Sequence, residues 1–362
     1  MKAYVLHNIN DLKYEEVSVP SVTEDEVLVE VHAAGICGSD VPRVFQTGTY
    51  SYPLIVGHEF SGKVVKVGKT QNEGWLNKRV GIFPLIPCRA CAPCRQKQYE
   101  MCRHYSYLGS RQNGGFAEYV SVPAENLIEL PKQVTYEQAA MLEPMAVAVH
   151  AMRRAAVKAG DSIAVCGLGT IGLLLLQFLM DMRMQQNLAI DKVFVIGNKD
   201  FQQKKILDMG LPQSCYCDSR QQDVNEWIEE QTDGAGVNVF FECVGKNETL
   251  SQAVNAAAPA GRIVTVGNPA SDMVLAKNVY WKILRNQLTI KGTWNSSFVH
   301  DPEDDWHYVL SRLLANAIEP QALITHRLPL ERLEEGLCIM RDKKEDYIKI
   351  MGTSCENYRN YN

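Results

Sequence analysis

The stretch Ser162–Gly172, which reads SIAVCGLGTIG, decides the fold of this chain. It starts with a short apolar run typical of a strand and continues with the pattern Gly-x-Gly-x-x-Gly, after which a Leu-rich helical segment follows. In a strand–turn–helix unit, the first glycine permits the tight turn, the second lets the backbone approach a pyrophosphate, and the third lets the helix pack closely on the strand. We therefore predict a dinucleotide-binding loop here rather than a simple glycine turn.

The segments around this loop alternate between strand and helix patterns. Four further strand candidates follow it, separated by helical stretches, at residues 193–196, 237–241, 262–266 and 288–291. Such alternation indicates a parallel, doubly wound α/β sheet of the Rossmann type.

The part of the chain before about residue 135 has a different texture, because it is rich in β-branched residues and interrupted by glycine and proline. Strands are expected there at residues 27–33, 63–67 and 116–120, and a helical stretch at 136–158. We predict a Rossmann domain at residues 150–290, inserted into a β-rich catalytic domain that is built from residues 1–149 and 291–362.

Bulk composition excludes several classes of protein. The chain has 362 residues, enough for two domains, and a net charge of −5, which offers no basic surface for nucleic acid. The N-terminal segment lacks the apolar core of a signal peptide, and the longest apolar run, Ile171–Met180, is interrupted by Gly172 and Gln177. A membrane span needs about 20 apolar residues, so we expect a cytoplasmic protein with neither a membrane nor a nucleic-acid partner.

Four of the 11 cysteines lie in one short loop, in the pattern Cys88-x-x-Cys91-x-x-Cys94-x7-Cys102. Four thiolates at this spacing match a closed, tetrahedral zinc site, and such a zinc ion is structural because no coordination position stays open. An iron–sulfur cluster is the competing use of four cysteines. The other motifs in the chain favour zinc.

A second group of possible metal ligands is spread over Gly35–Asp40, Gly57–Glu59 and Glu143–Pro144. Singly, a buried thiol, a loop histidine or a helix carboxylate carries no special meaning. Together they resemble the catalytic zinc site of the medium-chain alcohol and polyol dehydrogenases, and residues 57–68 carry that family's pattern Gly-His-Glu-x-x-Gly-x5-Gly. The cysteine loop, the glycine loop and Glu242–Gly245 follow in the family's order, so the likeness covers essentially the whole chain.

This resemblance implies a GroES-like catalytic domain with an open zinc site, in which water or substrate is the fourth ligand. The zinc ligands that it implies are Cys37, His58 and Glu143. Glu59 would lie beside the metal or exchange with a ligand, and Ser39 would accept the alcohol proton. Pro42 occupies the position of the relay histidine found in some members. An open zinc ion polarises the substrate oxygen while hydride passes to a nicotinamide cofactor, so two zinc ions per chain are expected.

Within this family the chain resembles polyol-phosphate dehydrogenases of the galactitol-1-phosphate 5-dehydrogenase type. The stretches that carry this likeness are Cys37–Arg43, Gly57–Gly62, Gly109–Tyr119 and Gly292–Asn295. By this alignment Arg43 and Arg111 fall where dehydrogenases of neutral polyols place tyrosine or threonine, and paired guanidinium donors suit a phosphate. The open alternative is that Arg43 pairs with Asp40 and does not face the substrate.

The predicted reaction is therefore oxidation of a polyol phosphate to a ketose phosphate. An unphosphorylated polyol dehydrogenase of the sorbitol or L-iditol type and an NADPH-dependent ketose-phosphate reductase stay open as alternatives. The opposite wall of the substrate pocket is expected to contain Trp294, Asn295 and Ser296.

The choice of cofactor depends on residues 195–200, which read VIGNKD. Gly197 stands where NAD-binding chains have a carboxylate for the adenosine ribose, and Lys199 follows it, which suits a 2′-phosphate. NADP is therefore preferred to NAD, although Asp200 would provide an NAD-type contact if it turned inward. The residues expected to bind the cofactor are Gly167, Gly169, Thr170, Ile171, Gly172, Asn198, Lys199, Val244, Val266, Gly267 and Thr293.

The segment 288–294 lies late in the predicted Rossmann sheet, where an edge strand would be a natural dimer contact, so we expect a homodimer or a homotetramer. The active site is expected in the cleft between the two domains.

A zinc-finger module is a weaker hypothesis because of the acidic charge and the dinucleotide loop. A zinc-free quinone reductase or crystallin-like protein is disfavoured by Cys37, His58 and Glu143 together.

Overall fold

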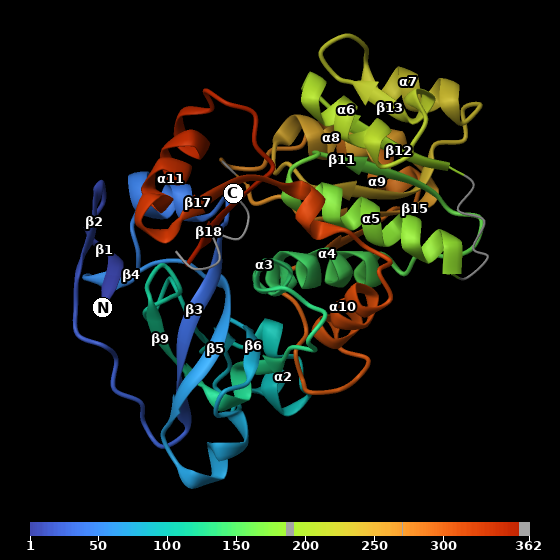
Figure 1. Cartoon of the computed structure of the whole chain (residues 1–362). Helices are drawn as coiled ribbons and strands as arrows, with labels where there is room; N and C mark the ends of the chain where they lie inside the picture. The colour runs from blue at the N-terminus through green and yellow to red at the C-terminus, as the bar shows by residue number, and fades with distance from the viewer. Residues whose placement is uncertain (186–191, 270, 355–362) are drawn as a thin grey trace. The chain divides into compact units, whose positions relative to one another are not determined.

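The structure is a computed structural model that describes residues 1–185, 192–269 and 271–354 (Figure 1). It divides into two compact units, one formed by Met1–Ala146 with Ser296–Asn362 and the other by Val147–Asn295. The first unit needs both ends of the chain, because β18 (Lys349–Thr353) pairs antiparallel with β3 (Glu26–Ile36). This pairing brings a late segment of the chain next to an early one.

The second unit contains a six-stranded sheet in the order β13-β12-β11-β14-β15-β16, in which every neighbouring pair is parallel. The strands are β11 (Ser162–Cys166), β12 (Lys192–Gly197), β13 (Tyr216–Asp218), β14 (Val237–Glu242), β15 (Ala257–Thr265) and β16 (Thr289–Gly292). This order, with the chain reversing its direction of progress at β11, is that of a Rossmann fold. The predicted doubly wound sheet is confirmed.

Helices connect these strands. They are α5 (Thr170–Gln185), α6 (Asp200–Asp208), α7 (Val224–Gln231), α8 (Asn247–Ala256) and α9 (Lys277–Arg285). Central-strand residues such as Val165, Phe240 and Phe241 are fully buried, as is the Leu173–Leu176 run of α5. A parallel sheet covered on both faces explains why its strands read as continuous apolar runs. The sequence did not predict β13, since three residues are too few to show a period.

The first unit is built around a seven-stranded sheet in the order β10-β6-β5-β3-β18-β17, with β9 also paired to β3. The further strands of this sheet are β5 (Glu59–Val67), β6 (Arg79–Ile82), β9 (Tyr119–Pro123), β10 (Leu127–Glu129) and β17 (Ile324–Pro329). A second sheet pairs β1 (Lys2–Asn8) with β2 (Asp11–Glu16) and β4 (Leu54–Ile55). This unit has the β-rich character that the sequence predicts.

The strand expected at 116–120 is displaced along the chain, because β9 starts at Tyr119. Phe116 is instead tied to other segments: its N–H donates to the Val56 carbonyl at 3.0 Å, and its carbonyl accepts from the Tyr4 N–H at 2.8 Å. These long-range contacts are invisible in the local apolar pattern.

The helical stretch predicted at 136–158 is divided at Met141 into α3 (Tyr136–Ala140) and α4 (Leu142–Ala155). Thr135 and Gln138 form a capping box that starts α3. Two later helices, α10 (Asp305–Leu314) and α11 (Leu333–Asp342), belong to the first unit. None of the helices in the described part of the chain is long and apolar enough to cross a membrane.

Alanine substitutions at two glycines of the Gly167–Gly172 loop should differ in their effect on the free energy of unfolding. A Cβ atom at Gly172 would lie 2.0 Å from the Gly167 carbonyl oxygen, whereas one at Gly169 would meet nothing within 4 Å. Gly172→Ala should lower the free energy of unfolding by about 1–3 kcal/mol, and Gly169→Ala should change it by less than about 0.5 kcal/mol. Urea unfolding of both variants measures this difference, and equal stabilities would contradict the close packing at Gly172.

Candidate metal and dinucleotide sites

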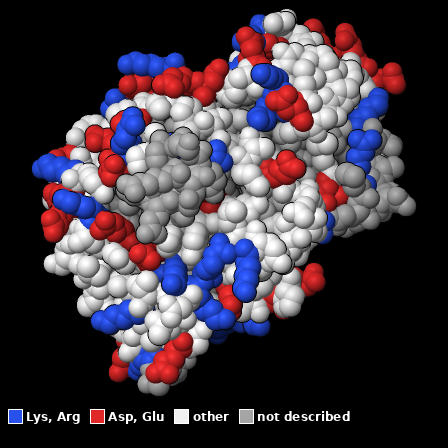
Figure 2. Space-filling view, in the orientation of Figure 1, with Lys and Arg blue, Asp and Glu red and all other residues white. Residues whose placement is uncertain are grey.

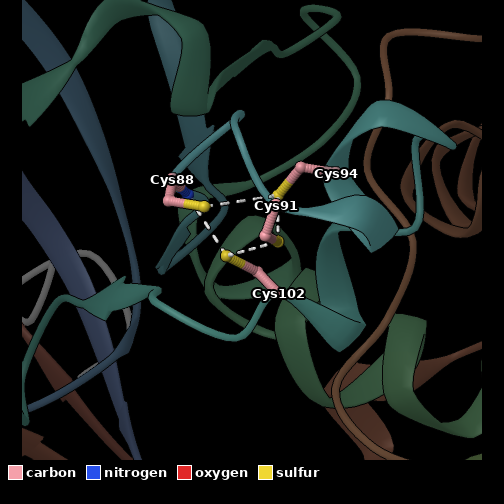
Figure 3. Close-up of side chains that lie close together, drawn as sticks. All are labelled: Cys88, Cys91, Cys94 and Cys102. Atoms are coloured by element: carbon pink, nitrogen blue, oxygen red, sulfur yellow. Dashed lines mark hydrogen bonds between the residues drawn. The ribbon is translucent and has the colours of Figure 1, made fainter.

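The four-cysteine loop runs between two short strands, β7 (Leu85–Ile86) and β8 (Ser106–Tyr107), which pair antiparallel at its base. The four sulfur atoms gather in one place (Figure 3). Their separations are 3.4 Å for Cys91–Cys94 and 3.9 Å for both Cys88–Cys94 and Cys91–Cys102. Zinc–sulfur bonds of about 2.3 Å in a tetrahedron place the sulfurs about 3.8 Å apart, so these residues fit a zinc ion.

Backbone donors favour the thiolate form in part of this loop. The N–H groups of Arg103 and Cys94 lower the pKa of Cys91 to about 6, and those of Ala90 and Cys91 lower the pKa of Cys88. Burial raises the pKa of Cys94 to about 12. Metal binding requires deprotonated thiols, so Cys88 and Cys91 suit an incoming cation, which would then help Cys94 to ionise.

A second cluster of possible ligands lies where β3 meets β5. Cys37 follows the end of β3, His58 precedes β5, and the two strands pair antiparallel with Gly35 opposite Glu59. One ligand atom from each of Cys37, His58 and Glu59 lies within 4.8 Å of the others. A thiolate, an imidazole and a carboxylate are the donor types of catalytic zinc sites. The residues of this second cluster therefore fit a zinc ion as well.

The buried carboxylate of Asp40 stabilises this cluster. It accepts a hydrogen bond from the Cys37 N–H at 3.0 Å and lies 3.3 Å from His58 Nδ1. Burial disfavours a charged imidazole, but Asp40 and Cys37 together raise the pKa of His58 well above its usual value. The surroundings thus favour positive charge, which a metal ion would supply. Ser39, the predicted proton acceptor, donates its hydroxyl hydrogen to Cys37 Sγ at 3.3 Å.

Glu143, the third zinc ligand that the resemblance implies, is not a member of this cluster. It lies in the first turn of α4, and its Oε1 accepts a hydrogen bond from the Tyr107 hydroxyl at 3.1 Å. Burial raises the pKa of Glu143 to about 7; His58 and Lys349 oppose this effect, and Glu59 adds to it. The Tyr107 ring also lies 5.7 Å from that of His58, which places Glu143 near the cluster, although Glu59 is the carboxylate grouped with Cys37 and His58.

Sequence reasoning missed Lys349, which lies in β18. Its Nζ donates to Glu59 Oε2 and to the Ile36 carbonyl, the latter at 3.0 Å, and the Lys349 and Glu59 side chains are each 2% exposed. A lysine is almost never fully buried unless it is paired. The sequence feature that could have indicated this residue is that it is the single charged residue of the KIMGT strand. Its carboxylate partner, however, comes from a distant part of the chain.

The two arginines predicted to bind substrate have different surroundings. Arg43 Nη1 donates to Asp40 Oδ1 at 2.6 Å, which is the alternative left open by the sequence. The Arg111 guanidinium carbon lies 4.1 Å from the ring centre of Tyr50 and 4.4 Å from that of Tyr105. Arg111 Nη1 also donates a hydrogen bond to the Tyr105 carbonyl at 3.4 Å. No carboxylate pairs with Arg111 within residues 1–185, 192–269 and 271–354, so its charge is free to meet an anion.

The three residues predicted for the opposite wall of the substrate pocket differ in exposure and in hydrogen bonding. Trp294 is 54% exposed, and Asn295 has a positive φ of 52° at the end of the second unit. Ser296 starts the returning part of the first unit and is 2% exposed. Its hydroxyl accepts a hydrogen bond from Trp306 Nε1 at 3.0 Å, so it is already paired inside that unit.

The residues predicted to bind the cofactor share one location, since they follow the carboxyl ends of parallel strands. The glycine loop joins β11 to α5, and the others follow β12, β14, β15 and β16. Buried Glu242 shapes this edge, because it accepts hydrogen bonds from the N–H groups of Val244 and Gly245 at 2.8 and 2.9 Å. Ligands of open α/β sheets bind at this edge, next to the helix N-terminus that receives phosphates.

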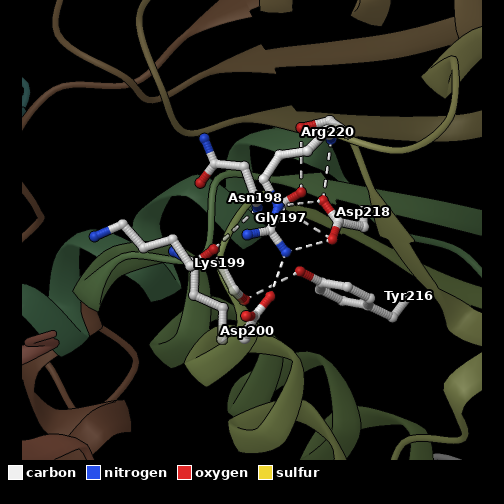
Figure 4. A network of polar contacts seen from close by, with 9 residues as sticks. Gly197, Asn198, Lys199, Asp200, Tyr216, Asp218 and Arg220 are labelled. Atoms are coloured by element: carbon white, nitrogen blue, oxygen red, sulfur yellow. Dashed lines mark hydrogen bonds and ion pairs between the residues drawn. The ribbon is translucent and has the colours of Figure 1, made fainter.

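The end of β12 is crowded at Gly197, where NAD-binding chains have a carboxylate. A Cβ atom at Gly197 would lie 2.9 Å from the Tyr216 hydroxyl and 3.0 Å from Gln202 Oε1. Arg220, which the sequence did not predict, pairs with Asp218 and with Asp200 (Figure 4). Asp200 is therefore paired with a cation in this structure. Arg220 was missed because it follows the unrecognised strand β13.

Two families match this chain. Residues 23–132 match the alcohol dehydrogenase GroES-like domain, and residues 155–315 match the zinc-binding dehydrogenases. The first match contains Cys37, His58 and the cysteine loop, and the second contains the glycine loop. Fold and site together define a zinc-dependent oxidoreductase that uses a nicotinamide dinucleotide.

The chain belongs to the zinc-dependent medium-chain alcohol and polyol dehydrogenase family, as predicted. It is 30% identical over 338 residues to galactitol 1-phosphate 5-dehydrogenase of Escherichia coli K12, covering 93% of this chain and 95% of that protein. Sorbitol dehydrogenase of Bacillus subtilis is 27% identical over 356 residues, covering 97% and 96%. The crystal structure of galactitol-1-phosphate dehydrogenase from Escherichia coli matches with a TM-score of 0.88 at 28% identity, covering 98% of this chain and all of that one.

The zinc content of the protein should show whether the four-cysteine loop binds a zinc ion. We expect two zinc ions per wild-type chain and one in Cys91→Ser, because three thiolates cannot complete the closed site. Cys338→Ser is the matched control, since Cys338 is a free cysteine outside both clusters and should leave the zinc content unchanged. Iron in place of zinc, or an unchanged zinc content in Cys91→Ser, would contradict the interpretation.

Proposed function

We propose that this chain catalyses the reversible oxidation of a secondary alcohol in a polyol phosphate to the corresponding ketose phosphate. The centre at Cys37, His58 and Glu143 carries the reaction, and a nicotinamide dinucleotide accepts the hydride. The observation that supports a phosphorylated substrate is the free charge of Arg111, which rests against Tyr50 and Tyr105. Stacked arginines keep a rigid set of donors for an anion.

The chemistry divides among residues of the first unit. A zinc ion bound by Cys37, His58 and Glu143 would supply a Lewis acid for the substrate oxygen. Asp40 Oδ1 lies 3.3 Å from His58 Nδ1 and holds a negative charge beside that ring. Ser39, whose hydroxyl donates to Cys37 Sγ in this structure, would accept the alcohol proton and pass it outward. A nicotinamide dinucleotide held at the Gly167–Gly172 loop would supply the acceptor for the hydride of the alcohol's carbon–hydrogen bond. One alcohol and one oxidised cofactor thus give one ketone, one reduced cofactor and one proton.

Arg43 contributes to this site indirectly. Its contact with Asp40 at 2.6 Å balances the charge of a buried carboxylate that also faces His58. The phosphate of the substrate is therefore assigned to Arg111 alone.

We propose NADP as the preferred cofactor, with two zinc ions per chain. Gly197 leaves no carboxylate to repel a 2′-phosphate, and Lys199 follows it in the chain. Arg220 adds a second cation in the same region and pairs with both Asp200 and Asp218, so it offsets part of their negative charge. A 2′-phosphate would replace exposed Asp200 as one partner of Arg220, while Asp218 keeps the guanidinium in place.

We also propose that the chain forms a homodimer through the edge of its parallel sheet, with a tetramer as the larger possibility. β16 is the last strand in the sheet order, and large apolar side chains in it and in the preceding helix α9 are exposed. They are Tyr280 at 54%, Trp281 at 46%, Leu284 at 50% and Ile290 at 41%. An exposed edge strand flanked by large apolar side chains is typical of an association surface.

Replacement of Arg111 tests the substrate class. Arg111→Ala should raise the KM for galactitol 1-phosphate, used as a probe, by about 10–100-fold, because a charge-assisted pair is lost. It should leave turnover of unphosphorylated sorbitol unchanged, and Arg111→Lys should restore part of the loss. Arg89→Ala is the control, since Arg89 stacks on Tyr99 and pairs with Glu125. Turnover of unphosphorylated polyols alone would instead assign a sorbitol-type dehydrogenase.

Cofactor preference should respond in opposite directions to two substitutions at the end of β12. Arg220→Ala should lower the ratio of kcat/KM for NADP over NAD by about 10-fold, whereas Asp200→Asn should raise it, because it removes a carboxylate that competes with the 2′-phosphate. Initial rates with both cofactors and one substrate measure the ratio. A wild-type preference for NAD that neither substitution changes would contradict this assignment.

A further inference from the structure

Tyr107 connects the cysteine loop with Glu143. It ends β8, and the register of the β7–β8 pair places it opposite Leu85. Cys88 comes shortly after β7 and Cys102 shortly before β8, so this pair of strands closes the base of the four-cysteine loop. A metal held by that loop would restrain both strands, and Tyr107 with them.

The Tyr107 side chain makes two contacts at the second metal centre. Its hydroxyl donates to Glu143 Oε1 at 3.1 Å, and its ring lies edge-on to His58 with ring centres 5.7 Å apart. In the described part of the chain, Tyr107 is the sole hydrogen-bond donor to the Glu143 side chain.

We propose that Tyr107 is a positioning residue, whose hydroxyl holds the Glu143 carboxylate in the orientation in which it binds the catalytic zinc ion. The inference rests on the proposed function, because it requires a metal at this centre. A hydrogen bond to one carboxylate oxygen limits rotation of the group and leaves the other oxygen for the metal. Partners of this kind commonly change metal affinity by about 10–100-fold.

The geometry also explains why Glu143 needs such a partner. Glu59, the carboxylate grouped with Cys37 and His58, is held by Lys349. Glu143 comes from the first turn of α4 and forms no ion pair among the described residues. The Tyr107 hydroxyl takes that place. A tyrosine that only filled space would be replaceable by phenylalanine, which keeps the ring against His58.

The test compares Tyr107→Phe with the wild-type holoenzyme, and Tyr99→Phe is the matched control. Tyr99 lies in the same loop and stacks with Arg89, a contact that phenylalanine retains. Zinc affinity of the Cys37 centre is measured by chelator competition, and the visible absorption of cobalt(II) at that centre reports its geometry. We expect Tyr107→Phe to weaken zinc binding by about 10–100-fold and to alter the cobalt spectrum, and Tyr99→Phe to do neither.

A second variant shows whether Tyr107 acts through Glu143. In a Glu143→Gln background, Tyr107→Phe should change the metal affinity much less than it does in the wild type, because coupled residues are not additive. Wild-type affinity and spectrum in Tyr107→Phe, or equal effects in both backgrounds, would overturn the inference. So would an increase in substrate KM with unchanged metal binding, which would make Tyr107 a substrate contact. Absence of metal from the Cys37 centre of the wild type would overturn the proposed function itself.

Discussion

The burial of several ionisable side chains around Cys37 is the constraint on which the first unit depends. Asp40, His58, Glu59 and Lys349 are each no more than 4% exposed. Buried charges are tolerated only when they are paired and hydrogen-bonded, and breaking one such pair is strongly destabilising. Asp40 meets His58 and Arg43, and Glu59 meets Lys349. The register of three strands supplies these partners, because β3 pairs with both β5 and β18.

The two units provide different kinds of binding group. The first unit concentrates negative charge and soft donors, which suits a cation. The second unit places backbone N–H groups, small residues and a helix N-terminus at the carboxyl ends of parallel strands, which suits the phosphates of a dinucleotide. In each unit the binding groups lie at the ends of strands and helices. Side chains and backbone N–H groups there are not engaged in the hydrogen bonds of a sheet.

Short-range patterns were the predictable part of this protein. The glycine loop and the four-cysteine loop could be recognised because a few residues at set spacing meet the geometric demands of a pyrophosphate or a tetrahedral metal. Long-range partners could not be recognised. Lys349, Tyr107 and Arg220 act beside residues that are distant in the chain, or follow a strand too short to show a pattern. The pairing of Arg43 with Asp40 remained an open alternative for the same reason.

What the sequence by itself determined is a Rossmann sheet, a β-rich unit and a four-cysteine loop, which local periodicity and spacing indicate, while the second set of metal ligands followed from the resemblance to a family. Only the tertiary structure shows that Lys349 pairs with Glu59 and Tyr107 with Glu143, that Arg43 pairs with Asp40, and that Arg220 pairs with Asp200. The physical reason is that the charge state and orientation of a side chain depend on every neighbour within a few ångströms. Those neighbours are brought together by strand register and sheet order.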